Sequence, residues 1–278
     1  MKKLLNRQKS QRKKSKHKRR EQCQYTVFFW YNLLMSEKLP QEYLNNMKQL
    51  LMDEFDDFIA SFNAERFYGL RVNTNKISTE EFERICPFEI EKIPFISNGY
   101  YYSGDDRPAK HPFYHAGLYY LQEPSAMIPA EILPVDEGDI VLDGCAAPGG
   151  KSTQIGCKPY GLLISNDISA SRCQGLLKNL ELAGMKNYCV MSEDLTDMSD
   201  RFEGFFDKIL IDAPCSGEGM FRKEPALINS YLQRGNDYYS ALQKQIVTSA
   251  LKMLKDGGKM VYSTCTFSIK ETKRSSNI

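Results

Sequence analysis

The stretch IVLDGCAAPGGKS at positions 140–152 decides the fold class of this 278-residue chain. A short apolar run at 140–142 is followed by a turn of small residues and then by a sequence that favours a helix. Glycine and alanine let the backbone approach a ligand closely, and the first N–H groups of a helix have no partners within the helix. The stretch therefore predicts a strand, a ligand-binding turn and a helix, in that order.

The same alternation continues along the chain. Strands that alternate with helices are typical of a parallel sheet covered by helices on both faces. We therefore predict an α/β fold with a doubly wound parallel sheet of five strands, in which a ligand binds at the carboxyl ends of the strands. The further strands are expected at 162–165, 188–191, 208–211 and 259–263, with helices at 169–183 and 237–255, the last ended by Gly257-Gly258.

The region before this sheet predicts a smaller, mixed subdomain. Apolar residues three and four positions apart over 40–62 indicate an amphipathic helix, with Pro40 near its first turn, where a missing N–H costs nothing. We predict an α+β subdomain at 35–120 and a main domain at 121–278. The other elements expected before the main sheet are strands at 68–74, 88–93 and 99–102 and helices at 79–85 and 124–133.

The first 34 residues differ in composition from the rest. Residues 1–20 carry eleven Lys or Arg and no acid, whereas residues 21–278 carry 26 basic and 35 acidic residues. We interpret 1–34 as a disordered basic leader or as a segment that is not native, because the sequence from Met35 resembles a natural start. The apolar run at 27–35 is roughly half of the ~20 residues that span a bilayer, and no signal cleavage site follows it. Since the body is net acidic, any contact with RNA or DNA there must come from a local patch.

Three nucleotide-like ligands compete for the turn. A dinucleotide fingerprint, GxGxxG, is excluded because the glycines of the turn have the wrong spacing. A P-loop, GxxxxGK[ST], requires glycine where Cys145 stands, so an ATPase is a competitor that misses the motif by one residue. S-adenosylmethionine requires a carboxylate for its ribose at the end of the second strand, where Asp167 lies. It also requires an acceptor for its adenine amino group after the third strand, where Glu193-Asp194 lies.

Two of the eight cysteines lie where ligand chemistry is expected. No CxxC pair exists, which argues against a zinc ribbon, and a long chain with few cysteines favours reduced thiols over disulfides. Cys215 follows the fourth strand in the sequence DAPCSG, and Cys265 follows the fifth in STCT. Because the carboxyl ends of neighbouring parallel strands meet at one edge, we expect both thiols at the ligand site. Most of the other cysteines are expected to be small buried apolar side chains.

Several motifs together resemble the Sun family of RNA 5-methylcytosine methyltransferases, closest to its small-subunit ribosomal RNA methyltransferase F type. The resemblance covers about residues 35 to 268. It implies a Rossmann-like, S-adenosylmethionine-dependent methyltransferase sheet preceded by an RNA-binding subdomain at 35–120. The motifs are DGCAAPGGKS at 143–152, DAPCSGEGMFRK at 212–223, STCTFS at 263–268, YGLRVNTNKIS at 68–78 and HAGLYYLQEPSAM at 115–127.

The resemblance also implies catalytic roles. Cytosine C5 is a poor nucleophile, and addition of a thiolate to C6 makes it reactive; the family assigns this attack to Cys265. The family assigns product release to Cys215, and it places Asp212 at the cofactor, from where this carboxylate can also reach the N3 edge of the cytosine. DNA 5-cytosine methyltransferases use a Pro-Cys nucleophile instead, which would make Cys215 the attacking residue.

The cofactor contacts implied for S-adenosylmethionine come from the turn and from the strand ends. For two of them a simpler interpretation stays open: Asp167 as a helix cap and Asp194 as a turn residue. The implied contacts are Cys145, Ala146, Ala147, Pro148, Gly149, Gly150, Lys151, Asp167, Asp194 and Asp212.

RNA contacts are predicted on a local basic rim, and the alternative is ordinary solvated charge. Aromatic side chains at 100–102 and Phe221 are expected either to stack on bases or to pack in the core. The candidate rim residues are Arg71, Lys110, His111, Arg222 and Lys223.

Two departures from the family pattern affect these expectations. Gly144 stands where a bulkier apolar residue is expected, and the polar tail at 269–278 does not continue the pattern. We therefore predict a truncation after the fifth strand, which leaves that strand an exposed edge and the chain unstable or inactive.

Three functions stay open at this point. The first is an RNA cytosine-C5 methyltransferase acting on ribosomal RNA or the small ribosomal subunit. The second is a catalytically dead fragment that only binds S-adenosylmethionine or RNA, and the third is a P-loop-like ATPase. We expect a cytoplasmic monomer without a metal ion or a membrane partner.

Overall fold

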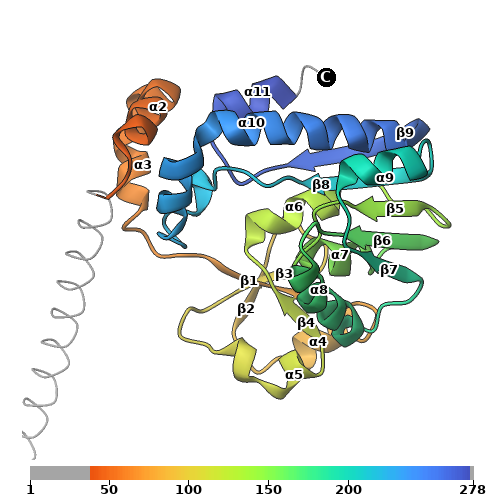
Figure 1. Ribbon diagram of the computed structural model, residues 1–278. Helices are drawn as coiled ribbons and strands as arrows, with labels where there is room; N and C mark the ends of the chain where they lie inside the picture. The colour runs from red at the N-terminus through yellow and green to blue at the C-terminus, as the bar shows by residue number, and fades with distance from the viewer. Residues whose placement is uncertain (1–37, 276–278) are drawn as a thin grey trace, which may run out of the picture. The chain divides into compact units, whose positions relative to one another are not determined.

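The five strands predicted for the main sheet are present. The computed structural model describes residues 38–275 (Figure 1), so the predictions for the leader at 1–34 and for Met35 lie outside the described residues. The strands pair in the order β7-β6-β5-β8-β9, and all four pairs are parallel. Their bounds are β5 (Ile140–Asp143), β6 (Leu162–Asn166), β7 (Tyr188–Met191), β8 (Phe206–Asp212) and β9 (Leu254–Ser263).

Alternate residues of these strands belong to two separate hydrophobic clusters. Val141 and Leu163 pack with residues of α6, α7 and α8, whereas their neighbours Leu142 and Ile164 pack with residues of α9 and α10. Because successive side chains of a strand point to opposite faces, helices cover both faces of the sheet, and the doubly wound α/β prediction is confirmed. The helices are α6 (Pro124–Ile132), α7 (Gly150–Ile155), α8 (Ala170–Ala183), α9 (Leu195–Arg201) and α10 (Leu227–Met253).

The helix before β9 differs from its prediction at both ends. It begins at Leu227 rather than near 237, and Gly235 interrupts it with a φ of +68°, which glycine adopts without steric cost. It ends at Met253, and Gly257-Gly258 lies inside β9 instead of ending the helix. A bend or a bulge at glycine leaves the apolar spacing on either side intact, so spacing alone does not locate it.

A second, antiparallel sheet has the strand order β2-β3-β1-β4. Leu70, Phe82 and Tyr119 are fully or almost fully buried between this sheet and its helices. Its fourth strand was not predicted, because three residues are too few for a periodic signal. The bounds are β1 (Tyr68–Val72), β2 (Ile90–Lys92), β3 (Gly99–Tyr102) and β4 (Tyr119–Leu121), with α4 (Thr79–Ile85), η2 (Pro108–Lys110) and α5 (Pro112–His115) between them.

By packing, the described residues divide into two compact units. Both sheets belong to the unit formed by residues from 66 to 217 and from 233 onward. The other unit holds α2 (Gln41–Leu51), η1 (Met52–Glu54), α3 (Phe55–Ser61), η3 (Glu218–Met220) and the start of α10. In that unit Tyr43 and Met47 pack around Phe221. The single helix predicted over 40–62 is wrong, because Met52 has a φ of +48° and breaks it.

Position 144 holds glycine where the family pattern led us to expect a bulkier apolar residue, and any side chain there would collide with the core. A Cβ added at Gly144 would lie 2.5 Å from Cδ1 of Ile211 and 3.3 Å from Cδ1 of Leu195. We expect Gly144→Ala to lower the free energy of unfolding by about 1–2 kcal/mol, because Ile211 must change its rotamer to make room.

The matched control removes the atom in the way. Ile211→Val deletes Cδ1 and costs about 1 kcal/mol by itself. In urea denaturation the double variant should be more stable than the sum of the two single effects predicts, by about 1 kcal/mol. Strict additivity would show that Gly144 is required for another reason.

Candidate active site

The glycine-rich turn between β5 and α7 is fixed to the strands on both sides of β5. The N–H of Gly144 donates to the carbonyl of Leu210 at 2.9 Å, and the N–H of Ala146 donates to the carbonyl of Asn166 at 2.8 Å. Gly149 has a φ of +107° directly before α7, and the Ala147-Pro148 peptide is cis. The predicted contact residues from Cys145 to Lys151 therefore form one ordered turn at the carboxyl ends of β5 and β6.

Asp143 lies beneath this turn and is fully buried. Its Oδ2 accepts from the hydroxyl of Ser152 at 2.6 Å, and Oδ1 has no hydrogen-bond partner among the described residues. Burial raises the pKa of Asp143 to about 7, partly offset by the Ser152 hydrogen bond. A buried carboxyl group with one free oxygen beside a small-residue turn fits a site that receives a polar ligand group.

The raised pKa of Asp143 predicts how stability changes with pH. The folded protein holds this proton up to about pH 7, whereas the unfolded chain releases it near pH 4. The contribution of the Asp143 carboxyl to the free energy of unfolding therefore falls as the pH rises from 4 to 7. We expect Asp143→Asn to be more stable than the wild type at pH 8, by up to about 4 kcal/mol, and to lose that advantage near pH 4. Urea denaturation at both pH values measures the difference, and an equal effect at both would contradict a buried protonated carboxyl.

Asp167 lies directly after β6 and faces the turn. Only 2% of the residue is exposed. Its Oδ2 accepts from the N–H of Ala147 at 3.3 Å and pairs with Nη1 of Arg172 at 3.1 Å, while Arg172 Nη2 donates to the carbonyl of Ala147. Its Oδ1 accepts from the N–H of Ser169 at 3.0 Å, next to the start of α8. Asp167 therefore bonds the backbone just ahead of α8, whose N-cap is Ser169 and has no side-chain cap bond, so the helix-cap interpretation is wrong. Its carboxylate also contacts the predicted ligand turn.

Asp194, the other predicted carboxylate, has an exposed side chain. It is the N-cap of α9 and accepts from the N–H of Thr196 at 2.7 Å. The adjacent Glu193 is tied to the end of β6, because Asn166 donates to its carbonyl and accepts from its N–H, each at 3.0 Å. The position of Asp194 suits a helix cap, and its contact with a cofactor stays a prediction.

Lys151 links the turn to the end of β8. Its Nζ lies 2.6 Å from Oδ2 of Asp212, and Oδ1 of the same carboxylate accepts from the hydroxyl of Ser263 at 2.8 Å. Ser263 is the last residue of β9. Residues from α7, β8 and β9 therefore meet at Asp212, as the sequence predicted for the carboxyl ends of neighbouring parallel strands.

The two cysteines singled out in the sequence are in contact. Sγ of Cys215, after β8, lies 3.1 Å from Sγ of Cys265, after β9. Cys265 is exposed and Cys215 is half-buried, and all seven cysteines in the described part of the chain are free thiols. The exposed sulfur is therefore open to a reaction partner while the other lies against it.

The two thiols differ in acidity. The hydrogen bond from Cys215 lowers the pKa of Cys265, whereas the same contact and burial raise the pKa of Cys215 well above its ordinary value. Cys265 is therefore the more acidic of the two thiols. Burial also raises the pKa of Cys145 to about 12, so this third thiol stays protonated beneath the turn. The arrangement supplies one nucleophile and one adjacent proton donor.

A buried polar network surrounds the two cysteines, and the sequence did not reveal it. Ser216, Gln243, Thr266 and Glu271 are all buried and hydrogen-bonded to one another. Glu271 lies on α11 (Ile269–Ser275), so the tail continues with an ordered helix and the prediction that the pattern stops after Ser268 is wrong for this segment. The available signal was a single acidic residue in a tail that we interpreted as polar and as not continuing the family pattern.

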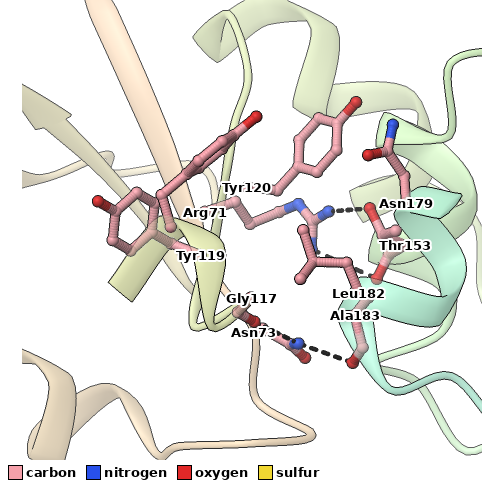
Figure 2. A pocket seen from close by; sticks show the side chains of 10 residues that line it. Arg71, Asn73, Gly117, Tyr119, Tyr120, Thr153, Asn179, Leu182 and Ala183 are labelled. Carbon is pink, nitrogen blue, oxygen red and sulfur yellow. Dashed lines mark hydrogen bonds between the residues drawn. The ribbon is translucent and has the colours of Figure 1, made fainter. Parts of the chain in front are cut away.

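Arg71 is not part of an exposed basic rim. It is 1% exposed and donates to the carbonyl of Gly150 at 3.0 Å and to the hydroxyl of Thr153 at 2.7 Å. Figure 2 shows it reaching α7 beside a pocket lined by Tyr120 and Asn179 among others. Its predicted role as a surface contact is wrong, because its guanidinium joins β1 to the helix that follows the ligand turn.

The other candidate RNA contacts divide into exposed and buried residues. Lys110 and Lys223 are exposed, and His111 and Arg222 are half-buried. The guanidinium of Arg222 donates to the carbonyl of Ala64. Tyr100 and Phe221 are core residues, so the expectation that they stack on bases is wrong for these two.

The described residues hold neither a candidate metal centre nor a membrane-spanning helix. Between residues 38 and 275 no three metal-ligating side chains form a group that could hold an ion. Over the same range, no helix has the length and apolar composition needed to cross a bilayer.

Comparison with known proteins gives matches along almost all of the described chain. The family model for 16S rRNA methyltransferase RsmB/F matches residues 130–277, and the model for the N-terminal domain of 16S rRNA methyltransferase RsmF matches residues 39–124. The first match extends past Ser268, in agreement with the ordered helix α11.

Individual relatives agree with these matches. The ribosomal RNA small subunit methyltransferase F of Erwinia tasmaniensis is 37% identical over 249 residues, covering 84% of this chain and 52% of that protein. The enzyme of the same name from Vibrio cholerae is 36% identical, covering 85% and 52%. The crystal structure of a methyltransferase homologue from Pyrococcus horikoshii superposes with a TM-score of 0.72 at 27% identity, covering 84% of this chain and 75% of that one. The chain spans about half the length of these curated relatives.

Proposed function

Because this chain belongs to the 16S rRNA methyltransferase RsmB/F family, we propose that it transfers a methyl group to C5 of a cytosine in RNA. The observation that carries the proposal is the contact of Cys215 and Cys265, 3.1 Å apart at the strand ends where Asp212 meets Lys151. An exposed low-pKa thiol, a protonated neighbour and a carboxylate are the groups that such a reaction requires.

The site fits S-adenosylmethionine as its cofactor. The small residues of the turn leave the backbone open to a ligand, Asp167 offers a carboxylate for ribose hydroxyls, and Asp143 offers a buried oxygen with no partner among the described residues. Lys151 and Asp212 close the side of the turn toward the cysteines. When bound, S-adenosylmethionine supplies an electrophilic methyl group.

Cys265 acts as the nucleophile in this proposal. Its thiolate adds to C6 of cytosine, forming a C–S bond and shifting electron density to C5 and N3. The negative charge that develops at N3 is neutralised by a proton from the Lys151–Asp212 pair, whose carboxylate lies three residues before Cys215 in the sequence. The interpretation of Cys215 as the attacking residue is disfavoured, because its raised pKa keeps it protonated at neutral pH.

Release of the product needs two coupled events. The proton on C5 passes to solvent, and the electrons of that C–H bond re-form the C5–C6 double bond as the C–S bond at C6 breaks and Cys265 leaves with its electron pair. Cys215 is suited to assist this step, because its thiol already hydrogen-bonds the sulfur that must leave.

The names of the relatives point to small-subunit ribosomal RNA as the substrate of those enzymes. We extend that substrate to this chain, with the subdomain at 35–120 binding RNA and Lys110 and Lys223 as exposed contacts. Action in the cytoplasm as a monomer is part of the same proposal.

The test uses the full chain, labelled S-adenosylmethionine and purified small-subunit RNA. Methyl transfer into one cytosine, located by bisulfite sequencing, supports the proposal. Cofactor and RNA binding without transfer by a folded protein would favour the binding-only alternative. Transfer to another atom of the base would contradict the cytosine-C5 assignment.

A further inference from the structure

Glu271 joins the two cysteine loops through one carboxylate. Its residue has no exposed surface, and Oε2 accepts from the N–H of Ser216 at 3.2 Å and from Nε2 of Gln243 at 2.8 Å. Its Oε1 accepts from the hydroxyl of Thr266 at 3.4 Å. Ser216 and Thr266 each directly follow one of the two cysteines. A residue on α11, near the end of the described chain in Figure 1, thus reaches the neighbour of each reactive thiol.

Further hydrogen bonds connect the same loops. The hydroxyls of Ser216 and Thr266 lie 2.8 Å apart, and Gln243 on α10 also donates to the carbonyl of Pro214 at 3.0 Å. The residues directly before and after Cys215 are therefore both held to this network. Hydrogen bonds to a carboxylate are stronger than those between neutral groups, and the buried donors here lose their partner if the carboxylate is removed.

We propose that Glu271 is a positioning residue that holds Cys215 and Cys265 in contact. The two loops leave the paired ends of β8 and β9, where the N–H of Ala213 donates to the carbonyl of Ser263 at 2.9 Å. Beyond that point, the side-chain hydrogen bonds of this network join them. A contact of 3.1 Å between two sulfur atoms is lost when one loop moves by about 1 Å, because hydrogen bonds weaken steeply with distance and angle. The part of the inference that concerns methyl transfer rests on the proposed function; the part that concerns the two thiols does not.

The role of Glu271 is separable from the packing of the fold. Within the described residues, the hydrophobic clusters on the two faces of the parallel sheet include no residue of α11. Glu271→Gln is the conservative variant. Its amide oxygen can still accept from the two groups that donate to Oε2, the N–H of Ser216 and Nε2 of Gln243. Its NH₂ group can donate to the hydroxyl of Thr266, because a hydroxyl accepts as well as donates. Glu271→Ala removes all three contacts.

The experiment measures how fast the two thiols join on treatment with 4,4′-dithiodipyridine. The Cys265 thiolate attacks the reagent and releases one thiopyridone, leaving a mixed disulfide on Cys265. The Cys215 sulfur then attacks that mixed disulfide, gives its proton to solvent and releases the second thiopyridone. Mass spectrometry of the cross-linked peptides follows the Cys215–Cys265 bond, and the rate of the second step reports their proximity.

We expect Glu271→Ala to slow this second step at least about tenfold and to raise the pH at which Cys265 reacts, because its donor is lost. Glu271→Gln should stay within about threefold of the wild type, since it keeps the contacts. Lys270→Ala, an exposed change on the same helix that removes only a surface pair with Asp237, should match the wild type. In the methylation assay Glu271→Ala should lower kcat and leave the KM for S-adenosylmethionine unchanged.

The proposal is overturned if Glu271→Ala forms the Cys215–Cys265 disulfide at the wild-type rate. It is also overturned if Lys270→Ala slows disulfide formation as much as Glu271→Ala does. If Glu271→Ala does not melt cooperatively, Thr266→Val and Gln243→Ala replace it, because both weaken the same network. Disulfide formation at the wild-type rate in both variants would equally overturn the proposal. If the wild-type protein forms the disulfide but transfers no methyl group, the proposed function is contradicted and the positioning role of Glu271 is not.

Discussion

Cys265→Ala is expected to lose both the covalent adduct with RNA and at least about 1,000-fold in the rate of methyl transfer, whereas Cys215→Ala keeps the adduct and accumulates it. The difference follows from the acidity of the two thiols. The contact with Cys215 lowers the pKa of Cys265, and the same contact raises the pKa of Cys215. In the proposed reaction the exposed and more acidic Cys265 attacks C6, and Cys215, which lies against it, helps the sulfur leave.

The adduct survives denaturing electrophoresis, so a shifted band measures it directly, and labelled methyl incorporation measures turnover. Cys189→Ala is the matched control, since Cys189 is an exposed free thiol on β7, at the other edge of the sheet. It should leave both readouts unchanged. An adduct formed by Cys265→Ala but not by Cys215→Ala would reverse the assignment and make Cys215 the nucleophile.

Most of the parallel sheet followed from the sequence because its signals are local. Each strand is a short apolar run, and helix-forming segments lie between most of them, which predicts parallel strands. The order in which the strands pair was not predicted. The meeting of Asp212, Cys215 and Cys265 followed for the same reason, since the carboxyl ends of neighbouring parallel strands lie together.

The errors lie where a backbone conformation or a distant partner decides. Met52 at a φ of +48° breaks a helix whose apolar spacing continues across the break. Arg71 looked like a surface charge, because arginine is rarely buried, yet the acceptors that hold it belong to α7, about 80 positions away in the sequence. Glu271 was missed because its partners are contributed by α10 and by two separate loops, and no spacing rule joins them.

The sequence also could not separate a ligand carboxylate from a local structural role, which was a helix cap for Asp167 and a turn residue for Asp194. Both are acids that follow a strand and precede a helix, so their local patterns are alike. The structure distinguishes them by burial, since Asp167 is enclosed beside Ala147 and Arg172 whereas Asp194 is exposed on α9. This contrast makes the two residues a matched pair for testing the cofactor site.

Asp167→Ala is expected to weaken S-adenosylmethionine binding at least about 100-fold, because two hydrogen bonds to a carboxylate are each worth about 1.5–3 kcal/mol. Titration calorimetry on the full chain measures the affinity. Asp194→Ala should change it by less than about threefold, since an exposed cap contributes mainly to the start of α9. Thermal melting controls for folding: Arg172 is largely exposed and can be solvated when its partner is removed, so the variant should still melt cooperatively.

The two affinities together decide what the carboxylate does. If Asp167→Ala binds as the wild type does, the carboxylate only braces Ala147 and the N–H of Ser169, and the ribose contact must be sought elsewhere. If Asp194→Ala loses as much as Asp167→Ala, the exposed cap turns inward when the cofactor binds. Asp167→Asn separates charge from shape, because its amide oxygen still accepts from one hydroxyl while its NH₂ cannot. An intermediate affinity for that variant would mean that the site recognises a diol through both oxygens of one buried carboxylate.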